Sequence, residues 1–263
     1  MSGAVSTWAL DWATVRVLAW RDVIRFFRQP SRIVGALAQP MLFWWVIGSG
    51  FSGSFASRAA GGLSYGAFFF PGVLAMVVLF SAIFATISVV EDRRGGFLAA
   101  VLAGPASRGA VALGKCLGST AVALMQASLF LLLAPLAGLS FSAMALGPLA
   151  LGALLLALAL TGVGVTLAWW VKSTAGYHGV MSVVLIPLWL LSGGLFPVEG
   201  AGPIVAALMR FNPLRVGVDV LRAALSDASV TTDGQALSLG LLMLAVFAAA
   251  GLGAAMLSVS RRD

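Results

Sequence analysis

Residues 59–90 read AAGGLSYGAFFFPGVLAMVVLFSAIFATISVV, a run of 32 residues without a charged side chain. A helix rises about 1.5 Å per residue, so roughly 20 apolar residues cross about 30 Å of hydrocarbon. Four further uncharged runs occupy 33–57, 116–171, 173–198 and 234–260. The run at 116–171 has 56 residues and can cross twice. These segments predict several membrane-spanning helices.

The composition excludes an ordinary soluble domain. Of the 263 residues, 60% are hydrophobic and 10% are charged, whereas a soluble domain has roughly 25% charged residues. The apolar runs are continuous, without the alternation of lumen-facing strands, which excludes a transmembrane β-barrel. We therefore predict an all-α polytopic membrane protein.

The longest run divides at a turn-forming cluster of Pro135, Gly138, Ser140 and Ser142. The chain then has six predicted transmembrane helices, at 33–52, 68–90, 116–136, 147–171, 175–195 and 236–258. We expect two units, an amphipathic connector helix at 1–32 and a single six-helix transmembrane domain at 33–263.

The positive residues predict the orientation. With six spans, 12 of the 16 Lys and Arg residues lie on the side that holds both termini, and Arg58, Arg210, Arg215 and Arg222 lie opposite. Positive residues are retained in the cytoplasm, so both termini should be cytoplasmic, in a bacterial inner membrane. This bias and contact with anionic lipid account for the net charge of +7, so no nucleic-acid partner is needed.

The N-terminal segment predicts an amphipathic interfacial helix that ends before Pro30. One predicted face is apolar and consists of Trp8, Trp12, Val15, Ala19, Val23 and Phe26. The opposite face has Arg21, Arg25, Arg28 and Arg32. Two roles stay open, anchoring to membrane lipid and contact with a partner protein.

The predicted spans contain no Asp, Glu, Lys or Arg. A carrier driven by protons or sodium generally keeps ionisable groups inside the bilayer. Energy for transport should therefore come from elsewhere.

Metal and hydrolytic chemistry have few candidate residues. His178 is the one histidine and Cys116 the one cysteine, which excludes a His and Cys metal cluster within one chain. His178 and Ser182, one helical turn apart, are candidates for an intramembrane hydrolytic pair, although such spacing is more typical of hydrogen bonds between helices. The role of His178 stays open.

Residues 109–116 read GAVALGKC and match a phosphate-binding loop except that Cys116 replaces the Ser or Thr that binds magnesium. Such a loop follows a buried strand in an α/β domain, whereas this segment lies between a polar loop and a predicted span. We expect no cofactor in this chain, and ATP and magnesium would belong to a partner chain.

Two loops have helical signals. Residues 91–115 read EDRRGGFLAAVLAGPASRGAVALGK, in which 97–103 form a short apolar helix that can lie on lipid or dock onto another protein. On the predicted outer side, 203–211 and 213–225 each begin with proline and are too short to cross. Within the second, Arg215, Asp219 and Arg222 have the spacing of helical ion pairs.

Taken together, these features resemble the ABC-2 type permease family, the membrane half of ATP-binding-cassette exporters. The resemblance covers nearly the whole chain and rests on the order of several short patterns. Its residues are Arg28, Pro30, Pro40, Glu91, Arg94, Gly95, Pro105, Ser107, Arg108, Gly114, Lys115, Ser192, Gly193, Phe196, Pro197, Pro203, Asn212, Pro213, Asp219 and Arg222.

The resemblance implies two permease chains, identical or different, and two ABC ATPase subunits. It makes 97–103 the coupling helix, and the residues implied for ATPase coupling are Glu91, Arg94, Gly95, Phe97, Leu98, Val101, Leu102, Pro105 and Arg108. Arg21, Arg25 and Arg28 would serve the connector helix, and Asn212, Pro213, Asp219 and Arg222 an extracytoplasmic cap. Spans one, two and five would approach the translocation path.

The leading hypothesis is an export permease without an ATPase site of its own. It would move an amphipathic, drug-like, lipid or polysaccharide substrate outward with ATP hydrolysed by a separate subunit. A membrane scaffold or assembly factor that transports nothing fits the hydropathy equally well, and an intramembrane enzyme would need His178.

Overall fold

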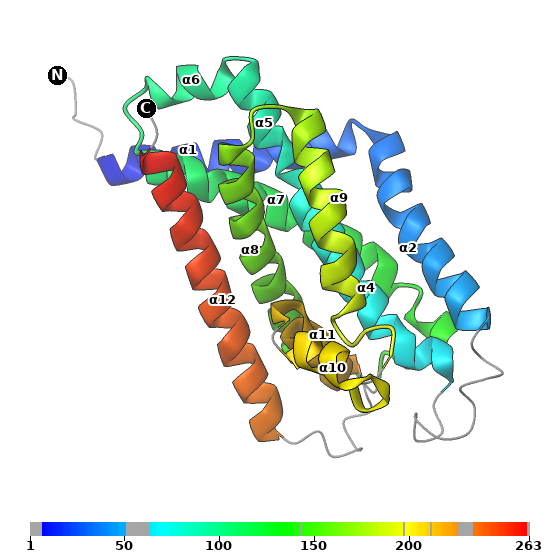
Figure 1. Ribbon diagram of the computed structural model, residues 1–263. Coiled ribbons are helices and arrows are strands. Elements are labelled where there is room, and N and C mark those ends of the chain that lie inside the picture. Colours follow the sequence, from blue (N-terminus) through cyan, green and yellow to red (C-terminus); the bar gives the residue numbers. More distant parts are fainter. Residues whose placement is uncertain are drawn as a thin grey trace.

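The computed structural model describes residues 7–50, 64–142, 144–196, 198–210, 212–225 and 234–261. All regular secondary structure in these ranges is helical, as predicted. Long helices stand side by side and short helices lie across both ends (Figure 1).

Within the described residues, five helices are long and apolar enough to cross a membrane. They are α2 (Pro30–Gly50), α4 with α5 (Tyr65–Ala85 and Ile87–Arg94), α7 (Arg108–Leu131), α8 (Leu146–Trp170) and α12 (Gly234–Arg261). The five match predicted spans one to four and six. Residues 51 and 52, at the end of the first predicted span, lie outside the described residues.

The predicted span 175–195 corresponds to α9 (Thr174–Leu190), a shorter apolar helix of 17 residues. At about 1.5 Å per residue it is roughly 25 Å long, less than the hydrocarbon thickness of about 30 Å. The helix gives way to a turn in which Gly193 has a positive φ of 78°. The structure thus has five helices of spanning length, and the sixth span stays a prediction.

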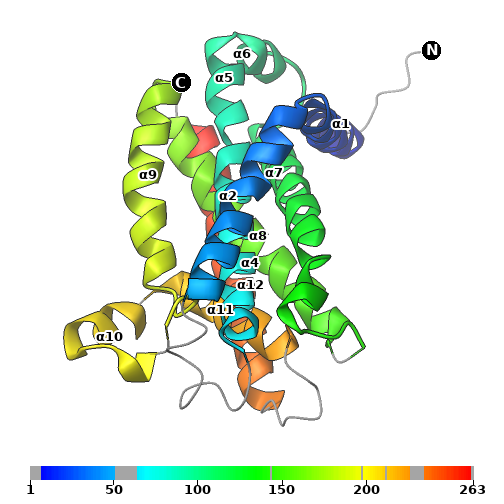
Figure 2. The same cartoon turned by 90° about the vertical axis from the view of Figure 1, so that its right-hand side faces the viewer.

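The elements at the two ends of the bundle differ (Figures 1 and 2). At one end lie α1 (Thr7–Phe27), α6 (Phe97–Leu102) and the last turn of α12. At the other lie η1 (Ala134–Ala137), η2 (Val198–Gly200), α10 (Pro203–Arg210) and α11 (Pro213–Leu225). We call these the α1 end and the α10 end.

Proline and glycine set several helix ends. Pro203 and Pro213 begin α10 and α11, because proline lacks the N–H that a first helical turn leaves unpaired. The predicted helix 203–211 therefore corresponds to α10, with residue 211 outside the described residues. The predicted helix 97–103 is α6, which ends one residue earlier, and Gly96 with φ 76° makes the turn before it.

The core centres on α4, whose residues are almost all buried. The helices around it approach closely where small residues meet, as expected when lipid gives no hydrophobic drive to pair helices. Between α8 and α12, a Cβ added to Gly162 would lie 2.3 Å from the carbonyl carbon of Gly251. These two helices therefore touch backbone to backbone.

The apolar face predicted for the N-terminal helix needs a correction. Val15 and Phe26 of that face are buried within the protein rather than turned to lipid, together with Leu18 and Asp22. This stripe packs against α7, where Gly114 leaves room for Leu18. Trp8 and Trp12 stay exposed. The helical periodicity of α1 is as predicted, but its buried stripe is rotated from the predicted apolar face and includes the charged residue Asp22.

Candidate coupling site at the α1 end

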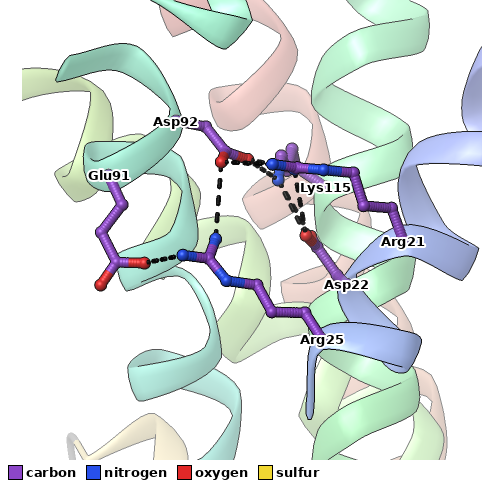
Figure 3. A network of polar contacts seen from close by, with 6 residues as sticks. All are labelled: Arg21, Asp22, Arg25, Glu91, Asp92 and Lys115. Atoms are coloured by element: carbon purple, nitrogen blue, oxygen red, sulfur yellow. Dashed lines mark hydrogen bonds and ion pairs between the residues drawn. The ribbon is translucent and has the colours of Figure 1, made fainter. Parts of the chain in front are cut away.

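Six charged side chains from three helices meet at the α1 end (Figure 3). They are Arg21, Asp22 and Arg25 of α1, Glu91 and Asp92 of α5, and Lys115 of α7. We call this group the charge cluster. Its three positive and three negative groups balance, so a ring of ion pairs can form across helices.

Lys115 lies at the centre of the charge cluster. Its Nζ is 2.9 Å from Oδ1 of Asp22 and 2.5 Å from Oδ2 of Asp92. Arg21 donates two hydrogen bonds to Asp92, at 2.6 and 2.8 Å, in the fork geometry typical of guanidinium and carboxylate. Arg25 donates to Glu91 at 2.7 Å and to Asp92 at 3.5 Å. Asp92 thus has three cationic partners.

The centre of the charge cluster is buried and its rim is not. The side chains of Lys115, Asp22 and Asp92 are 2%, 6% and 5% exposed, whereas those of Arg21 and Arg25 are about a third exposed. Removing one partner of a buried pair leaves a charge that neither water nor protein neutralises, at a cost of roughly 3–5 kcal/mol. The charge cluster therefore fixes α1 against α5 and α7.

Burial raises the pKa of the Asp22 carboxyl above its ordinary value, because desolvation disfavours the charged form, and the nearby Lys115 ammonium only partly opposes this effect. The hydrogen bonds that Arg21 donates to Asp92 raise the pKa of its own guanidinium. The surroundings of Asp22 therefore disfavour its ionised form.

The short helix α6 directs its apolar side chains inward. Leu98 is 1% exposed, and Phe97, Val101 and Leu102 are partly buried against the same core. The guanidinium of Arg21 lies 3.9 Å above the centre of the Phe97 ring, a cation–π contact that joins α6 to α1.

The outer surface of α6 consists of small residues. Ala99 and Ala100 are exposed, as are Arg94, Gly95 and Pro105 beside them. The apolar side chain of Leu98 was expected to meet a partner. It packs within the chain instead, because the chain's own core covers it. A partner would meet the alanine surface.

Arg108 is the remaining predicted coupling residue, and Arg28 the remaining predicted connector residue. Arg108 begins α7 and donates to the carbonyl of Ser260 at 3.4 Å, which ties α7 to the end of α12. Asp11 of α1 accepts a hydrogen bond of 2.7 Å from the backbone N–H of Ser107, just before α7. Arg28 is exposed at the end of α1.

Asp22, Asp92 and Lys115 were not singled out from the sequence as site residues. A signal was present, since Asp22 lies four residues from both Leu18 and Phe26 on the buried stripe of α1. Lys115 likewise lies four residues after the buried Val111 of α7. A charged residue on an apolar helical stripe predicts a buried ionic partner.

The predicted cap residues hold α11 to the end of α9. The amide of Asn212 donates to the carbonyl of Leu188 at 2.6 Å, and its oxygen accepts from the N–H of Leu214 at 2.9 Å, next to Pro213 at the start of α11. Arg222 donates to the carbonyl of Gly193 at 2.9 Å.

The local ion pairs expected from spacing are present on α11. Arg215 lies 3.3 Å from Asp219, and Arg222 lies 3.6 Å from the same carboxylate. Asp219 is half exposed, so these pairs orient the helix surface more than they stabilise it.

The weaker motifs find structural explanations. Residues 109–116 lie inside α7, where Lys115 binds two carboxylates, so this segment does not form a phosphate-binding loop. The Ser182 hydroxyl donates to the backbone carbonyl of His178 at 2.9 Å rather than to its ring. Within the described residues no group of three His, Cys, Asp or Glu side chains can hold a metal ion.

The long apolar helices define a multi-pass membrane protein, in which buried charges hold α1 against α5 and α7 at one end. The chain belongs to the ABC-2 type transporter family, whose model matches residues 13–226. This family provides the transmembrane permease component of ABC transporters, which lacks an ATPase site of its own and works with an ABC ATPase partner.

Curated relatives support the assignment over most of the chain. Nodulation protein J of Neorhizobium galegae is 28% identical over 241 residues, covering 85% of this chain and 86% of the relative. The protein of the same name from Rhizobium leguminosarum bv. trifolii is 28% identical, with 81% and 80% covered. Putative transport permease ycf38 of Pyropia yezoensis is 25% identical, with 82% and 75% covered.

Proposed function

We propose that this chain is the permease subunit of an exporter that moves an amphipathic, drug-like, lipid or polysaccharide substrate outward across the bacterial cytoplasmic membrane. Two copies of a separate ATPase would hydrolyse ATP with magnesium, and a second permease chain would complete the complex. The observation that supports a coupled permease is the anchoring of α6 to α1, α5 and α7 through Phe97, Leu98 and the charge cluster.

The proposed coupling depends on a stiff connection from α6 to the bundle. α6 follows α5, which continues α4 after a break at Thr86. The charge cluster holds α5 against α1 and α7, so a force on α6 moves these helices together. The exposed Ala99 and Ala100 offer a flat surface for the ATPase.

In this proposal the α1 end is cytoplasmic, because most Lys and Arg residues lie there. α9 with the turn after it serves as the sixth span, and α10 and α11 cap the exit of the path. α1 packs on α7, so the connector acts as part of the transmembrane domain.

The test is ATP-driven accumulation of substrate in the lumen of inverted membrane vesicles that contain the chain with its ATPase. Ala100→Glu places a charge on the outer surface of α6 and should abolish both copurification of the ATPase and ATP-dependent transport. The matched control is Ala207→Glu on the exposed surface of the short helix α10, which should leave ATPase binding unchanged. If the wild-type complex binds ATPase but moves no substrate, the chain is a scaffold and the proposal is wrong.

A further inference from the structure

A partly open cavity of about 280 Å³ lies among α1, α2, α4, α5, α7 and α9. Its lining along α4 and α5 extends from Met76 to Ser88, roughly 18 Å at about 1.5 Å per residue. This volume is close to the lower limit of roughly 300–1,000 Å³ for ligand pockets. The cavity is therefore long and narrow, and suits one chain and a small head group.

The lining combines an apolar wall with uncharged polar groups. Met76, Phe80 and Phe84 form the apolar side. The polar side chains come from five helices and are Gln39, Ser81, Ser88, Gln126 and His178. Such a lining matches a molecule with a hydrocarbon part and hydrogen-bonding groups.

The charged residues of the lining are already neutralised. Asp22 and Arg25 border the cavity at the α1 end, and both are bound within the charge cluster. Their signs are opposite, so the cavity offers no net charge to a ligand. An ionised head group would enter without a counter-ion and lose its hydration, which is costly.

Ser88 is the polar group that points most directly to a ligand. It is 4% exposed, lines the cavity, and its hydroxyl has no hydrogen-bond partner among the described residues. Ser81, by contrast, donates to the Gln126 amide across the cavity wall. Buried hydroxyl groups are normally hydrogen-bonded, and a ligand hydroxyl or amide would satisfy Ser88.

The cavity can be reached from the side. Gly35 and Gln39 of α2 and His178 of α9 all line it and are exposed at the surface of the chain. α9 and α2 lie to either side of α4 in Figure 1, and in Figure 2 α2 lies in front of α4 with α9 to its left. A molecule that lies in the membrane could therefore enter between these two helices.

We infer that this cavity is the loading site for the transported cargo, and that the cargo is an amphiphile with an uncharged hydroxyl- or amide-bearing head and a hydrocarbon chain. The inference rests on the proposed export function. The head would lie near Ser88 and His178, and the chain along Phe80 and Met76. Ser88 precedes Asp92 by one helical turn. Asp22 and Arg25 line the cavity and also belong to the charge cluster. Binding of cargo in the cavity would therefore act on the helices that move α6.

The test uses three photoreactive dodecyl probes with a glycerol, a carboxylate or a trimethylammonium head. The permease with its ATPase is placed in nanodiscs of phosphatidylethanolamine and phosphatidylglycerol, and labelled residues are mapped by mass spectrometry without ATP. The glycerol probe should label the α4 and α7 walls at least tenfold more than either charged probe. Excess unlabelled dodecylglycerol should compete.

Two variants separate the cavity from the outer apolar surface. Gly35→Phe fills the opening, and its added Cβ meets no atom within 4 Å, so labelling should fall at least tenfold without loss of folding. Gly253→Phe on α12 is the matched control, equally open at Cβ and outside the cavity, and should label like wild type. Ser88→Ala removes one hydrogen bond and should weaken labelling roughly 3- to 10-fold.

If all three probes label equally, and labelling is unchanged in both Gly35→Phe and Ser88→Ala, the probes bind the outer apolar surface as bulk lipid does. This result overturns the inference. A second arm adds ATP to inverted vesicles, where loaded dodecylglycerol should be released to the lumen. Retention of the probe by a complex that exports another substrate identifies a resident lipid and overturns the cargo assignment. A complex that exports nothing contradicts the proposed function instead, whatever the labelling shows.

Discussion

The two ends of the bundle are held together by different interactions. At the α1 end, Lys115, Asp22 and Asp92 are buried charges that share partners across three helices. At the α10 end, side chains donate to backbone carbonyls, as Arg222 does to Gly193 and Trp189 to Gly72. Loss of Lys115 at the first end removes the cation that two buried carboxylates share, whereas loss of Trp189 or Arg222 at the second end leaves a backbone carbonyl without its donor. The ends should therefore differ in how they respond to mutation.

The largest effect should come from Lys115→Met. It leaves the carboxylates of Asp22 and Asp92 buried without their shared cation, at a cost of roughly 3–5 kcal/mol. The thermal unfolding midpoint of the purified chain should fall strongly, and adding Asp22→Asn should recover part of the loss. A midpoint near that of wild type would show that Arg21 and Arg25 alone neutralise these carboxylates.

At the α10 end, Arg222→Leu should have a smaller effect. It removes the hydrogen bond to Gly193 and the stacking of the guanidinium on Phe68, 4.6 Å from the ring centre, together about 1–3 kcal/mol. The thermal unfolding midpoints of Arg222→Leu and Lys115→Met are measured side by side and compared. Arg222→Lys, which keeps the positive charge, is the control. A loss as large as that of Lys115→Met would remove the distinction between the two ends.

Asp22→Asn should lower the free energy of unfolding by on the order of 1 kcal/mol at neutral pH. The cost is small because the amide oxygen still accepts a hydrogen bond from Lys115, and Lys115 still has Asp92 as its counter-ion. The raised pKa of Asp22 means that the folded chain holds this proton more tightly than the unfolded chain, whose carboxyl has a pKa of about 3.9.

The contribution of Asp22 to stability is therefore full below the unfolded pKa and is lost as pH rises through the raised folded pKa. The difference in unfolding midpoint between wild type and Asp22→Asn should shift in favour of the variant over that interval. A shift in favour of wild type would show that Lys115 outweighs desolvation at this carboxyl.

The smallest effect should come from Arg215→Ala. Its pair with Asp219 is exposed and lies within one helix, so the loss should be roughly 0–0.5 kcal/mol. High salt should leave even this difference unchanged or smaller when midpoints are measured beside wild type. If Arg215→Ala lowers stability more than Asp22→Asn does, Arg215 stabilises the chain through a contact other than its pair with Asp219.

Much of the fold follows from local sequence. The uncharged runs located five helices of spanning length, and proline at 203 and 213 located the starts of α10 and α11. The span count was harder, because composition at 175–195 does not show where α9 ends. Pro187 lies within α9, and the turn at Gly193 follows only three residues after its end.

The candidate site was predicted less completely. Residues 97–102 do form a helix, but Leu98 faces the chain's own core rather than a partner. Sequence alone gives the apolar character of a side chain and not the direction of the surface that buries it. Arg21 and Arg25, predicted to serve the connector helix, bind Asp92 and Glu91 of the same chain, which the spacing within α1 does not show.

Run length, proline position and spacing within one helix were sufficient to determine the membrane class, the helix starts and the pair of Arg215 with Asp219, because each depends on residues a few positions apart. The meeting of Lys115 with Asp22 and Asp92, 93 and 23 residues away along the chain, was decided only by tertiary structure. The cavity that Ser88 lines was likewise decided only by tertiary structure. Both depend on the register and separation of packed helices, and no local pattern encodes these.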